Sequence, residues 1–377
     1  MPLFRPLLCA LVLILAAILP LSPARVLAQD QPSLEAMAGQ MLLVGFRGLT
    51  AAEADPVMQD IAAGRVGGVV LFDRDAALKS PVRNIESPAQ VASLIAALKA
   101  KAAIPLLVAV DQEGGRVDRL KVKYGFPAAQ SAASLGSRHD LALTRRAAEA
   151  LGHTLAKVGF NLNFAPVLDV NVNPASPAIG ALERSFSPDP AQVAAQAGAF
   201  IKGLHAAGIL ACAKHFPGHG SAGADSHLGV ADVTRTWSAG ELIPYELLAP
   251  GRAKEGQAFD LVMTGHLFNT NWDLRHPATL SRAALSLLRE RIGYEGVVIS
   301  DDLQMKAVSE QYGFEEVVRL ALQADVDILL FGNNLAYEPD VAARAVGLMV
   351  RMVQKGEIPR ERLERSYGRI MALKAKL

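Results

Sequence analysis

Three segments of the chain bring acidic, basic and histidine side chains together at spacings that suit catalysis on a polar substrate. The first is Val110–Arg119 (VDQEGGRVDR), the second is Lys214–Gly220 (KHFPGHG) with a downstream Asp225-Ser226-His227, and the third is Val298–Leu303 (VISDDL). Carboxylates, imidazoles and fixed cations carry nucleophilic, acid–base and electrostatic catalysis. The three segments therefore predict an enzyme with a polar site.

The Asp225-Ser226-His227 segment holds a carboxylate and an imidazole two residues apart. An imidazole has an unperturbed pKa of about 6.5, so it can donate and accept a proton near neutral pH. A neighbouring carboxylate can hold one ring N–H, fix the tautomer and favour the imidazolium. Gly218, Gly220 and Gly223 surround this segment, and we expect it to move and to close over a substrate as a lid.

Short apolar runs that predict strands alternate with longer amphipathic runs that predict helices. The predicted strands span Gln40–Phe46, Gly67–Phe72, Pro105–Asp111, Asn161–Asp169, Ile209–His215, Leu261–His266, Gly296–Asp301 and Val326–Phe331. The clearest predicted helices span Pro88–Lys101, Leu141–Val158, Pro190–Ala207 and Arg282–Arg291. Continuous apolar strands joined by crossover helices are typical of a parallel sheet covered on both faces. Eight such units in a chain of this length favour an α/β fold, the (β/α)8 TIM barrel, over an open doubly wound sheet.

Two features that the sequence lacks narrow the fold further. No Gly-rich GxGxxG turn follows the first predicted strand, and Gly114-Gly115 is too short to replace one, which counts against a dinucleotide-binding fold. No Pro/Ser-rich linker and no low-complexity tract divides the chain. We therefore predict a single catalytic barrel domain over residues 29–377.

Polar residues close six of the eight predicted strands at their C-terminal ends. They are Asp111, Asp169, Lys214-His215, His266, Asp301-Asp302 and Asn333-Asn334. In a barrel of this kind the C-terminal strand ends converge on one face, where active sites are built. A single polar residue at a strand end is often only the start of a loop. The repetition, however, predicts a polar pocket on that face.

These motifs together resemble glycoside hydrolase family 3, and within it the short, single-barrel β-N-acetylhexosaminidase (β-N-acetylglucosaminidase) branch. The resemblance extends from Ala38 to about Leu335 and rests on KHFPGHG, the downstream DSH and the SDD strand end. It includes residues 163–170 (NFAPVLDV), 183–187 (ERSFS) and 263–266 (MTGH). The resemblance implies a retaining exo-glycosidase that removes terminal β-linked N-acetylglucosamine through a covalent glycosyl-enzyme intermediate, without a metal or an organic cofactor.

The resemblance also implies a role for each matching residue. It implies that Asp301 is the catalytic nucleophile, that His227 is the proton donor and that Asp225 is the partner of His227. It implies substrate contacts from Asp111, Arg119, Arg184, Lys214, His215 and His266. A retaining glycosidase needs a carboxylate that attacks the anomeric carbon and a proton source for the leaving oxygen, which is usually a second carboxyl group. Here an imidazole would replace that second carboxyl group.

Alternatives remain for several of these residues. Asp302 competes with Asp301 as the nucleophile, but neighbouring strand residues point to opposite faces, so Asp302 more simply anchors nearby backbone or basic groups. Asp169 and Asn163 are expected to support the end of the fourth strand. The four charged residues among the implied substrate contacts suit sugar hydroxyls through charge-assisted hydrogen bonds. They would equally suit a structural ion-pair network across the barrel mouth.

The sequence departs from the family pattern in two places. Ser221-Ala222 stands where the branch commonly has Asp-Thr, which changes only the detail of this segment. Ile179–Phe186 (IGALERSF) is longer by two residues than the related segment. Whether Arg184 reaches the pocket therefore depends on how the extra residues fold.

Other functions compete with this interpretation. A phosphorylase or a β-glucosidase of the same family would use the same residues, and an imidazole acid/base would not repel phosphate as a carboxylate would. A zinc-dependent hydrolase would draw its ligands from His215, His219, Asp225 and His227. Its HxxxH pair contains a Pro-Gly step, however, and cannot lie on one helical face. A sugar-binding protein without catalytic activity would need no nucleophile.

Residues 1–28 have the order of a secretory signal: Arg5, an apolar run over Leu7–Leu19, and a small-residue site at 26–28 before Gln29. We predict cleavage after residue 28 and an exported enzyme, periplasmic or secreted. Such an enzyme would meet peptidoglycan fragments or environmental amino-sugar oligosaccharides. An uncleaved membrane anchor is the alternative, but this apolar run is shorter than the roughly 20 residues that a spanning helix needs.

The composition limits the kinds of molecule that the protein is expected to bind. Residues 1–28 hold two arginines and no acid, so cleavage would change the formal net charge from +1 to −1. A nearly neutral chain without a basic tract gives no case for nucleic acid or an anionic membrane surface. Of the two cysteines, Cys9 would leave with the signal, so Cys212 is expected to be a buried, inert thiol without a disulfide partner. We expect a monomer that binds a saccharide.

Overall fold

The computed structural model describes residues 1–3 and 32–377. The predicted signal segment, residues 1–28, lies outside the described residues except for its first three positions. Contacts within the chain separate Ser33–Leu377, as one unit, from Met1–Pro32. Within the part of the chain that is described, no helix is both long enough and apolar enough to cross a membrane.

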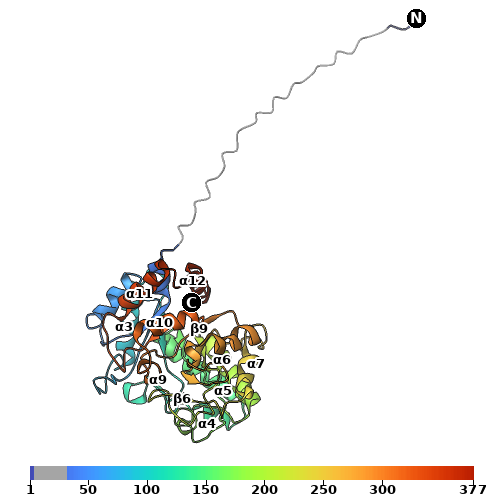
Figure 1. The fold of residues 1–377 in the computed structure, drawn as a ribbon. Coiled ribbons are helices and arrows are strands. Elements are labelled where there is room, and N and C mark those ends of the chain that lie inside the picture. The colour runs from blue at the N-terminus through green and yellow to red at the C-terminus, as the bar shows by residue number, and fades with distance from the viewer. Residues whose placement is uncertain (4–31) are drawn as a thin grey trace. The chain divides into compact units, whose positions relative to one another are not determined.

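Eight parallel strands form the central sheet of residues 33–377 (Figure 1). They are β1 (Leu42–Gly45), β2 (Gly68–Val70), β3 (Leu107–Val110), β4 (Leu162–Asn163), β5 (Leu210–Phe216), β7 (Leu261–Thr264), β9 (Val297–Ile299) and β10 (Leu329–Phe331). Their hydrogen-bonded order is β10-β1-β2-β3-β4-β5-β7-β9, and a parallel bridge between Ile299 and Ile328 connects the two ends. The sheet is therefore a nearly closed barrel, and all eight predicted strands are confirmed.

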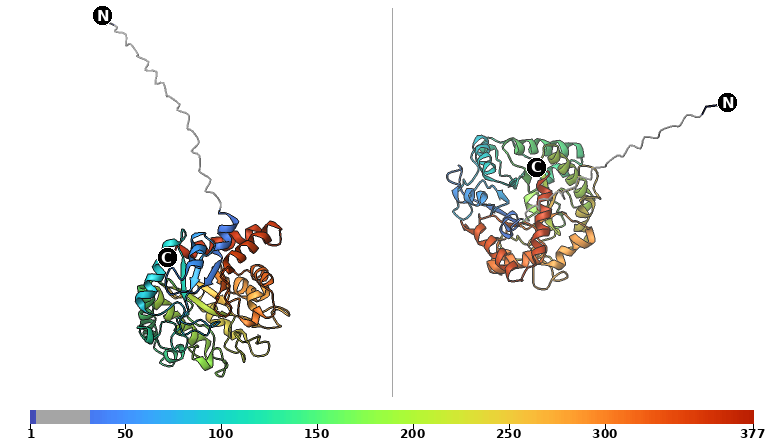
Figure 2. Two further views of the ribbon diagram at one scale, coloured as in Figure 1. Left: turned by 90° about the vertical axis from the view of Figure 1, so that its left-hand side faces the viewer. Right: turned by 90° about the horizontal axis from the view of Figure 1, so that it is seen from above.

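Helices surround this barrel in chain order, which the colour sequence around the ring in Figure 2 makes visible. The α-helices are α1 (Leu34–Gln40), α2 (Asp55–Ala62), α3 (Pro88–Lys101), α4 (Ala132–Gly136), α5 (Leu141–Lys157), α6 (Pro190–Ala206), α7 (Ile243–Leu248), α8 (Arg282–Ser286), α9 (Lys306–Ser309), α10 (Phe314–Gln323), α11 (Val341–Gln354) and α12 (Arg360–Lys374). Shorter turns are η1 (Val122–Tyr124), η2 (Gly180–Leu182), η3 (Ala239–Leu242), η4 (Ala278–Leu280) and η5 (Leu287–Ile292). Parallel strands inside and crossover helices outside confirm the predicted (β/α)8 architecture.

Local sequence explains where the long helices begin. The side chains of Ser87 and Asp189 accept hydrogen bonds from backbone N–H groups in the first turns of α3 and α6, and a proline follows each of them. The predicted helices that became α3, α5 and α6 are observed within one residue of their expected bounds. The predicted helix Arg282–Arg291 is a regular α-helix only over α8 and then widens into the π-helical turn η5.

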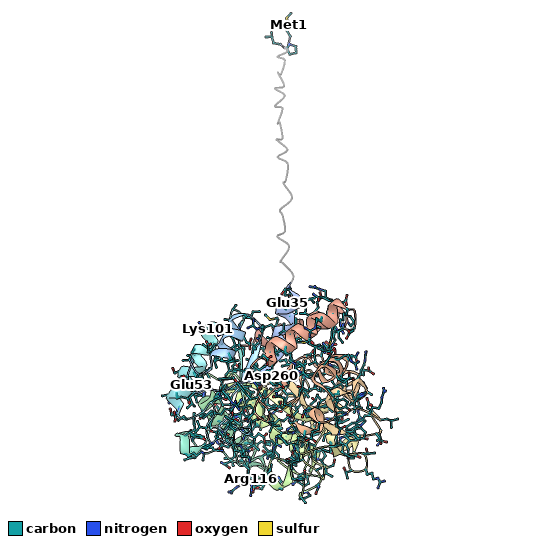
Figure 3. The ribbon with its side chains drawn as sticks, turned by 60° about the vertical axis from the view of Figure 1, so that its left-hand side comes forward. Met1, Glu35, Glu53, Lys101, Arg116 and Asp260 are labelled. Atoms are coloured by element: carbon teal, nitrogen blue, oxygen red, sulfur yellow. The ribbon has the colours of Figure 1, made fainter. Side chains whose placement is uncertain are left out.

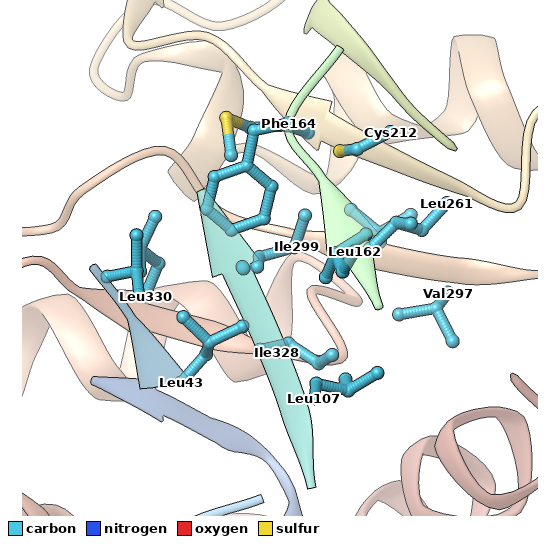
Figure 4. Packing of buried hydrophobic residues seen from close by; sticks show 14 of the residues in the cluster. Leu43, Leu107, Leu162, Phe164, Cys212, Leu261, Val297, Ile299, Ile328 and Leu330 are labelled. Carbon is cyan, nitrogen blue, oxygen red and sulfur yellow. The ribbon is translucent and has the colours of Figure 1, made fainter. Parts of the chain in front are cut away.

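Apolar side chains from the strands fill the interior of the barrel (Figure 4). Leu43, Leu107, Leu162 and Ile299 are among those buried there. Burial of each large aliphatic side chain stabilises the fold by roughly 1.5–3 kcal/mol. Cys212 packs among them without exposed surface, and burial raises the pKa of its thiol. It is the buried thiol that the sequence predicts.

Two features differ from the predicted elements. The predicted strand Asn161–Asp169 is regular only over β4, because Pro166 has no N–H to donate to a neighbouring strand. Beyond that proline, Val167 makes only an isolated bridge with Lys214. The second difference is a small parallel sheet of β6 (Ala231–Asp232) and β8 (Leu267–Phe268), which joins the loops after β5 and β7.

Candidate active site

A pocket of about 490 Å³ opens among the loops at the C-terminal ends of the strands. The predicted site residues in its lining are Asp111, Arg119, Arg184, Lys214, His215, Asp225, His227, Asp301 and Asp302. Arg116 also lines the pocket, and Figure 3 places it at the far end of residues 33–377 from Glu35 in α1. The pocket therefore lies on the face that the strand-end pattern predicts.

Buried charges form the inner wall of this pocket. The Nζ atom of Lys214 lies 2.7 Å from a carboxylate oxygen of Asp111 and 2.7 Å from one of Glu113. Arg184 donates to both oxygens of Glu113, at 2.8 and 2.7 Å. Burial would raise the pKa of Glu113, but the two cations outweigh burial and hold that pKa well below its usual range. An ion-pair network is thus present, and it faces the pocket, where fixed charges can bind hydroxyl groups.

Lys214 and His215 are adjacent in β5, yet both line the pocket. Consecutive residues of a regular strand point to opposite faces, but the pairing of β5 with β7 shifts register between Ala213 and Phe216. This shift interrupts the alternation at the two residues that the site uses. Asp169 then holds His215, because its carboxylate lies 2.7 Å from the ring Nδ1 and accepts from the backbone N–H at 3.1 Å.

Both histidines of the HxxxH pair contact other side chains, although Nδ1 of His219 is buried without a hydrogen-bond partner among the described residues. His215 Nδ1 contacts Asp169, and its Nε2 lies 3.2 Å from the Arg184 guanidinium. His219 Nε2 lies 3.3 Å from the hydroxyl of Ser226. Across residues 32–377 and the first three, no group of three or more His, Cys, Asp and Glu side chains is arranged to hold a metal ion.

Asp301 follows β9, and its backbone N–H donates to the carbonyl of Thr264 in β7 at 3.2 Å. One of its carboxylate oxygens accepts from the backbone N–H of Asp302 at 2.8 Å, and no described residue donates to the other oxygen. Burial would raise the pKa of Asp301, but three neighbouring histidines outweigh burial and lower that pKa below its ordinary value. The carboxylate is therefore ionised near neutral pH and can act as a nucleophile.

Asp302 anchors backbone. One of its oxygens accepts from the backbone N–H groups of Gln304 at 3.0 Å and Gly332 at 2.9 Å. Burial raises the pKa of Asp302 to about 6. Because its carboxylate is occupied by the chain that follows β9 and β10, the geometry favours Asp301 over Asp302 as a nucleophile.

Asp225 and His227 form a hydrogen-bonded pair on the loop after β5. Asp225 Oδ1 lies 2.8 Å from the ring Nδ1 of His227 and accepts from its backbone N–H at 2.9 Å. The hydrogen bond from His227 lowers the pKa of Asp225 to about 2. Burial would lower the pKa of His227, but the hydrogen bond with Asp225 and the charges of Asp301 and Asp225 outweigh burial, so that pKa is raised. The pair can therefore supply a proton through the ring Nε2.

Ser226, which lies between Asp225 and His227, fixes this pair to the barrel. Ser226 is 2% exposed, its hydroxyl contacts His219, and its carbonyl accepts from a backbone N–H of α9. Nearer β5, a carboxylate oxygen of Glu241 accepts from the backbone N–H of Gly220 at 3.1 Å. The loop is thus tied at its start and at Ser226, whereas at Gly223, between the two ties, an added Cβ would have no atom within 4 Å.

The two arginines of the prediction both reach the pocket. Arg119 is about one quarter exposed, and its Nε lies 3.9 Å from a carboxylate oxygen of Asp73. Arg184 reaches the pocket in spite of the longer loop around it, because Glu113 and the carbonyl of Ala178 hold its guanidinium. The extra residues of that loop therefore do not displace Arg184.

His266 differs from the other predicted contacts, because it is absent from the pocket lining among the described residues. It is 1% exposed, and its ring nitrogens lie 2.9 Å from the Thr279 hydroxyl and 2.9 Å from the Asp302 carbonyl. Burial lowers the pKa of His266. The structure therefore places it outside the pocket lining, as a buried support of the strand ends around Asp301.

Two residues of the site escape the sequence reasoning. Glu113 lies inside a motif that the sequence singles out, but its importance comes from Lys214 and Arg184, which are distant along the chain. Asp73 lines the pocket beside Arg119. It comes three residues after β2 ends, so a rule that covered the first few residues after each strand would have found it.

Comparisons with known proteins converge on one family. The family described as "Glycosyl hydrolase family 3 N terminal domain" matches residues 33–373. The protein named Beta-hexosaminidase LpqI of Mycobacterium tuberculosis is 36% identical over 344 residues, which cover 89% of this chain and 81% of that protein. A glycoside hydrolase family 3 β-N-acetylglucosaminidase from Paenibacillus sp. is 36% identical, with a TM-score of 0.81 over 92% of this chain and 63% of that one. A β-N-acetylhexosaminidase from Beutenbergia cavernae is 30% identical, with a TM-score of 0.80 over 92% of this chain and 99% of that one.

Proposed function

The chain belongs to glycosyl hydrolase family 3 and is a glycoside hydrolase, and from this premise we propose that it is a retaining exo-β-N-acetylglucosaminidase. One observation carries the proposal: the ionised Asp301 and the Asp225–His227 pair line a single pocket. The names of the relatives, β-hexosaminidase and β-N-acetylglucosaminidase, support an amino sugar as the substrate.

The first step forms a bond between Asp301 and the sugar. An oxygen of the Asp301 carboxylate attacks the anomeric carbon while the bond from that carbon to the leaving oxygen breaks. The leaving oxygen takes the proton from Nε2 of His227, and the aglycone departs as an alcohol. The configuration at the anomeric carbon is inverted once.

The second step releases the sugar. The now neutral His227 takes a proton from a water molecule, whose oxygen attacks the anomeric carbon and displaces the Asp301 carboxylate. This second inversion restores the original configuration. Asp225 favours the charged imidazole in both steps, since its carboxylate accepts the ring Nδ1–H.

The inner wall of the pocket explains the exo specificity that we propose. Lys214, Arg184 and Asp111 present fixed charges that suit the hydroxyl groups of one sugar ring. Lys214 and Glu113 are almost fully buried there, so the chain of a polysaccharide could not continue past this end. Only a terminal sugar would fit, with its aglycone toward the mouth.

The decisive experiment compares a chromogenic β-N-acetylglucosaminide with the matching β-glucoside. We expect the amino sugar to be the better substrate and Asp301→Ala to lower its kcat/KM by about 10³-fold or more. Asp55→Ala, at an exposed position in α2, is the control and should retain activity. Equal or greater activity on the glucoside would exclude the amino-sugar assignment, and full activity of Asp301→Ala would exclude the nucleophile.

His227→Ala tests the proton donor. A good leaving group needs little protonation, so we expect a small loss of kcat/KM for nitrophenyl substrates and a loss of about 10²–10⁴-fold for alkyl or sugar aglycones. Equal losses for both kinds of leaving group would contradict this role.

Whether water or phosphate accepts the sugar is a separate matter, since an imidazole acid/base tolerates an approaching phosphate. We propose hydrolysis. The products formed with and without added inorganic phosphate would distinguish the two. Free N-acetylglucosamine as the main product at millimolar phosphate supports hydrolysis, and the 1-phosphate as the main product would overturn it.

We also propose that the enzyme acts outside the cytoplasm, on peptidoglycan fragments or amino-sugar oligosaccharides. The support is the charged, apolar and small-residue order of residues 1–28. Mass measurement of the protein from a periplasmic or culture fraction would test it. A mature chain that begins at Gln29 is expected, and an intact N-terminus confined to the cytoplasm would refute it.

A further inference from the structure

A buried carboxyl group lies against the base of the loop that carries the proposed proton donor. Glu241 belongs to η3, which leads into α7, and it is 1% exposed. It is not one of the described residues that line the catalytic pocket. Burial raises the pKa of its carboxyl group to about 7. The two proposed reaction steps give this group no part, so its presence there needs a separate explanation.

The carboxyl group of Glu241 holds the backbone of the loop after β5. Its Oε2 atom accepts from the backbone N–H of Gly220 at 3.1 Å, and no other described group accepts from that N–H. The same oxygen lies close to Gly218, where an added Cβ would lie 2.9 Å from it and 2.6 Å from the Cβ of Glu241. A glycine at position 218 therefore makes room for the carboxyl group beside Gly220.

The other side of Gly220 is held by the segment after β4. An added Cβ at Gly220 would meet the carbonyl oxygen of Val170. The carbonyl of Gly220 accepts from the backbone N–H of Asn173 at 3.0 Å. The N–H and the carbonyl of Gly220 are thus held by two different parts of the chain, and loss of the Glu241 acceptor would release one of them.

A short series of contacts leads from Gly220 to the proposed proton donor. The preceding residue, His219, donates its backbone N–H to Asp169 at 2.8 Å, and its ring Nε2 lies 3.3 Å from the hydroxyl of Ser226. Ser226 directly precedes His227. A shift of the backbone at Gly220 would therefore reach His227 through His219 and Ser226.

The second oxygen of Glu241 argues against a purely stabilising role. This atom, Oε1, is buried and has no hydrogen-bond partner in the part of the chain that the structure describes. A buried polar atom without a partner costs free energy, and an apolar side chain of similar size would avoid that cost. An apolar side chain could not, however, accept from the N–H of Gly220. This contact is therefore the property that distinguishes Glu241 from an apolar residue.

We propose that Glu241 is a positioning residue for the transfer of the proton from His227. By accepting from the Gly220 N–H, it keeps the turn at residues 218–220 in place, and His219 and Ser226 then fix the position of the His227 ring relative to the leaving oxygen. Glu241 itself exchanges no proton with the substrate. This proposal rests on the role of His227 proposed above and adds the residue that places its ring.

The test compares two β-N-acetylglucosaminides that differ in the leaving group, a nitrophenol or a simple alkyl alcohol. Glu241→Met removes the acceptor but keeps a side chain of similar size. Because a misplaced donor mainly impairs the substrate that needs protonation, we expect kcat/KM to fall about 10²-fold with the alkyl glycoside and less than about fivefold with the nitrophenyl glycoside. The ratio of the two values does not depend on the fraction of folded enzyme, so a loss of stability alone leaves it unchanged.

Three further variants connect this ratio to the contact with Gly220. Glu241→Gln should restore the ratio to within about threefold of the wild type, because an amide oxygen also accepts from an N–H group. Gly218→Ala pushes the Glu241 side chain away from the other side and should change the ratio in the same direction as Glu241→Met. Glu246→Met, in α7 and paired with Arg291 at 3.0 Å, is the matched control and should keep the wild-type ratio.

The outcomes separate this proposal from the proposed function. An unchanged ratio in Glu241→Met, or in Gly218→Ala if the first variant does not fold, would overturn the positioning role while His227→Ala still separates the two leaving groups. A ratio in Glu241→Gln as altered as in Glu241→Met would overturn it as well, because the acceptor would not be what matters. If His227→Ala itself does not separate the leaving groups, the proposed role of His227 is overturned and this proposal with it.

Discussion

The two groups that carry the proposed chemistry have pKa values shifted in opposite directions. Histidine charges around Asp301 lower its pKa in spite of burial, so the nucleophile is ionised throughout the neutral range. The hydrogen bond with Asp225 and the charges of Asp301 and Asp225 raise the pKa of His227, so the donor keeps its proton at higher pH. Each group therefore favours the protonation state that the other needs.

Asp225→Asn should move the alkaline limb of the pH profile. In the wild type, kcat/KM should fall as pH rises through the raised pKa of His227, because the ring then has no proton to give to the leaving oxygen. The variant keeps the shape of residue 225 but removes its charge, so part of the interaction that raises the pKa of His227 is lost, that pKa falls and the limb shifts to lower pH. We expect activity near pH 7 to fall about 10²-fold or more. An unchanged alkaline limb would show that Asp225 does not set this pKa.

Glu113→Gln should damage binding and stability together. The buried carboxylate holds both Arg184 and Lys214, so an amide of equal size would leave two buried cations poorly compensated. We expect kcat/KM to fall by about 10- to 10³-fold and the free energy of unfolding in urea to fall by about 3–5 kcal/mol. Glu149→Gln, in an exposed pair with Arg145, is the matched control and should change stability by under about 0.5 kcal/mol. Equal effects of the two variants would refute the positioning role of Glu113.

Contacts that are local in sequence could be predicted, and long-range contacts could not. The spacing of Asp225 and His227 is enough to suggest their hydrogen bond, because only one residue separates them. The ion pair between Glu113 and Arg184 depends on how two distant loops fold, so the spacing of residues in the sequence cannot predict it. His266 illustrates the same limit. Its place at a strand end suggests a ligand contact, whereas Thr279 and the Asp302 carbonyl enclose its ring.

At the scale of elements, the loop after β5 carries the Asp225–His227 pair to the pocket that Asp301 also lines. Gly220 packs so closely against the segment after β4 that an added Cβ would lie 1.6 Å from the carbonyl oxygen of Val170. No such contact exists at Gly223 in the same loop, where an added Cβ would have no atom within 4 Å. The loop is therefore fixed at its first part and open in its middle.

Gly220→Ala and Gly223→Ala form a matched pair of substitutions in this loop. The first must push the chain away from Val170, and because backbone cannot give way cheaply, we expect loss of about 2–4 kcal/mol in stability and at least about 10²-fold in kcat/KM. The second should leave kcat/KM within about twofold, and the free energy of unfolding within about 0.5 kcal/mol, of the wild-type values. Urea unfolding and kinetics on a chromogenic substrate measure the difference. Similar behaviour of the two variants would mean that the loop is not fixed at Gly220.

The elements themselves were predictable in proportion to their length. Apolar runs such as Ile209–His215 and helices such as α6 carry enough periodic signal to be recognised. The two-residue strands β6 and β8 carry none, because their pairing depends on loops that meet only in the folded barrel. The register shift in β5, which turns both Lys214 and His215 toward the site, likewise has no signature in the local sequence.

At the scale of the whole molecule, the last helix joins the first elements of the barrel. Lys374 in α12 is almost fully buried, and its Nζ donates to the Gln40 side chain at 2.6 Å and to the Gly67 carbonyl at 2.7 Å. Burial lowers the pKa of Lys374 to about 7. The sequence could not indicate this contact, since a lysine near the end of a polar helix normally lies in water.

The titration of Lys374 makes the stability of the whole barrel depend on pH. Between the folded pKa near 7 and the ordinary value of 10.5, the unfolded chain binds the proton that the folded chain has lost, so the free energy of unfolding rises with pH in this window. Lys374→Met removes this contribution. We expect the wild type to gain roughly 2–4 kcal/mol relative to the variant between pH 6.5 and pH 10, as measured by urea unfolding at 25 °C. Lys101→Met, at an exposed position, should keep the wild-type slope. If Lys374→Met instead shows the wild-type dependence of the free energy of unfolding on pH, Lys374 does not lose its proton in this window. The two acceptors would then keep its ammonium group charged in the folded protein.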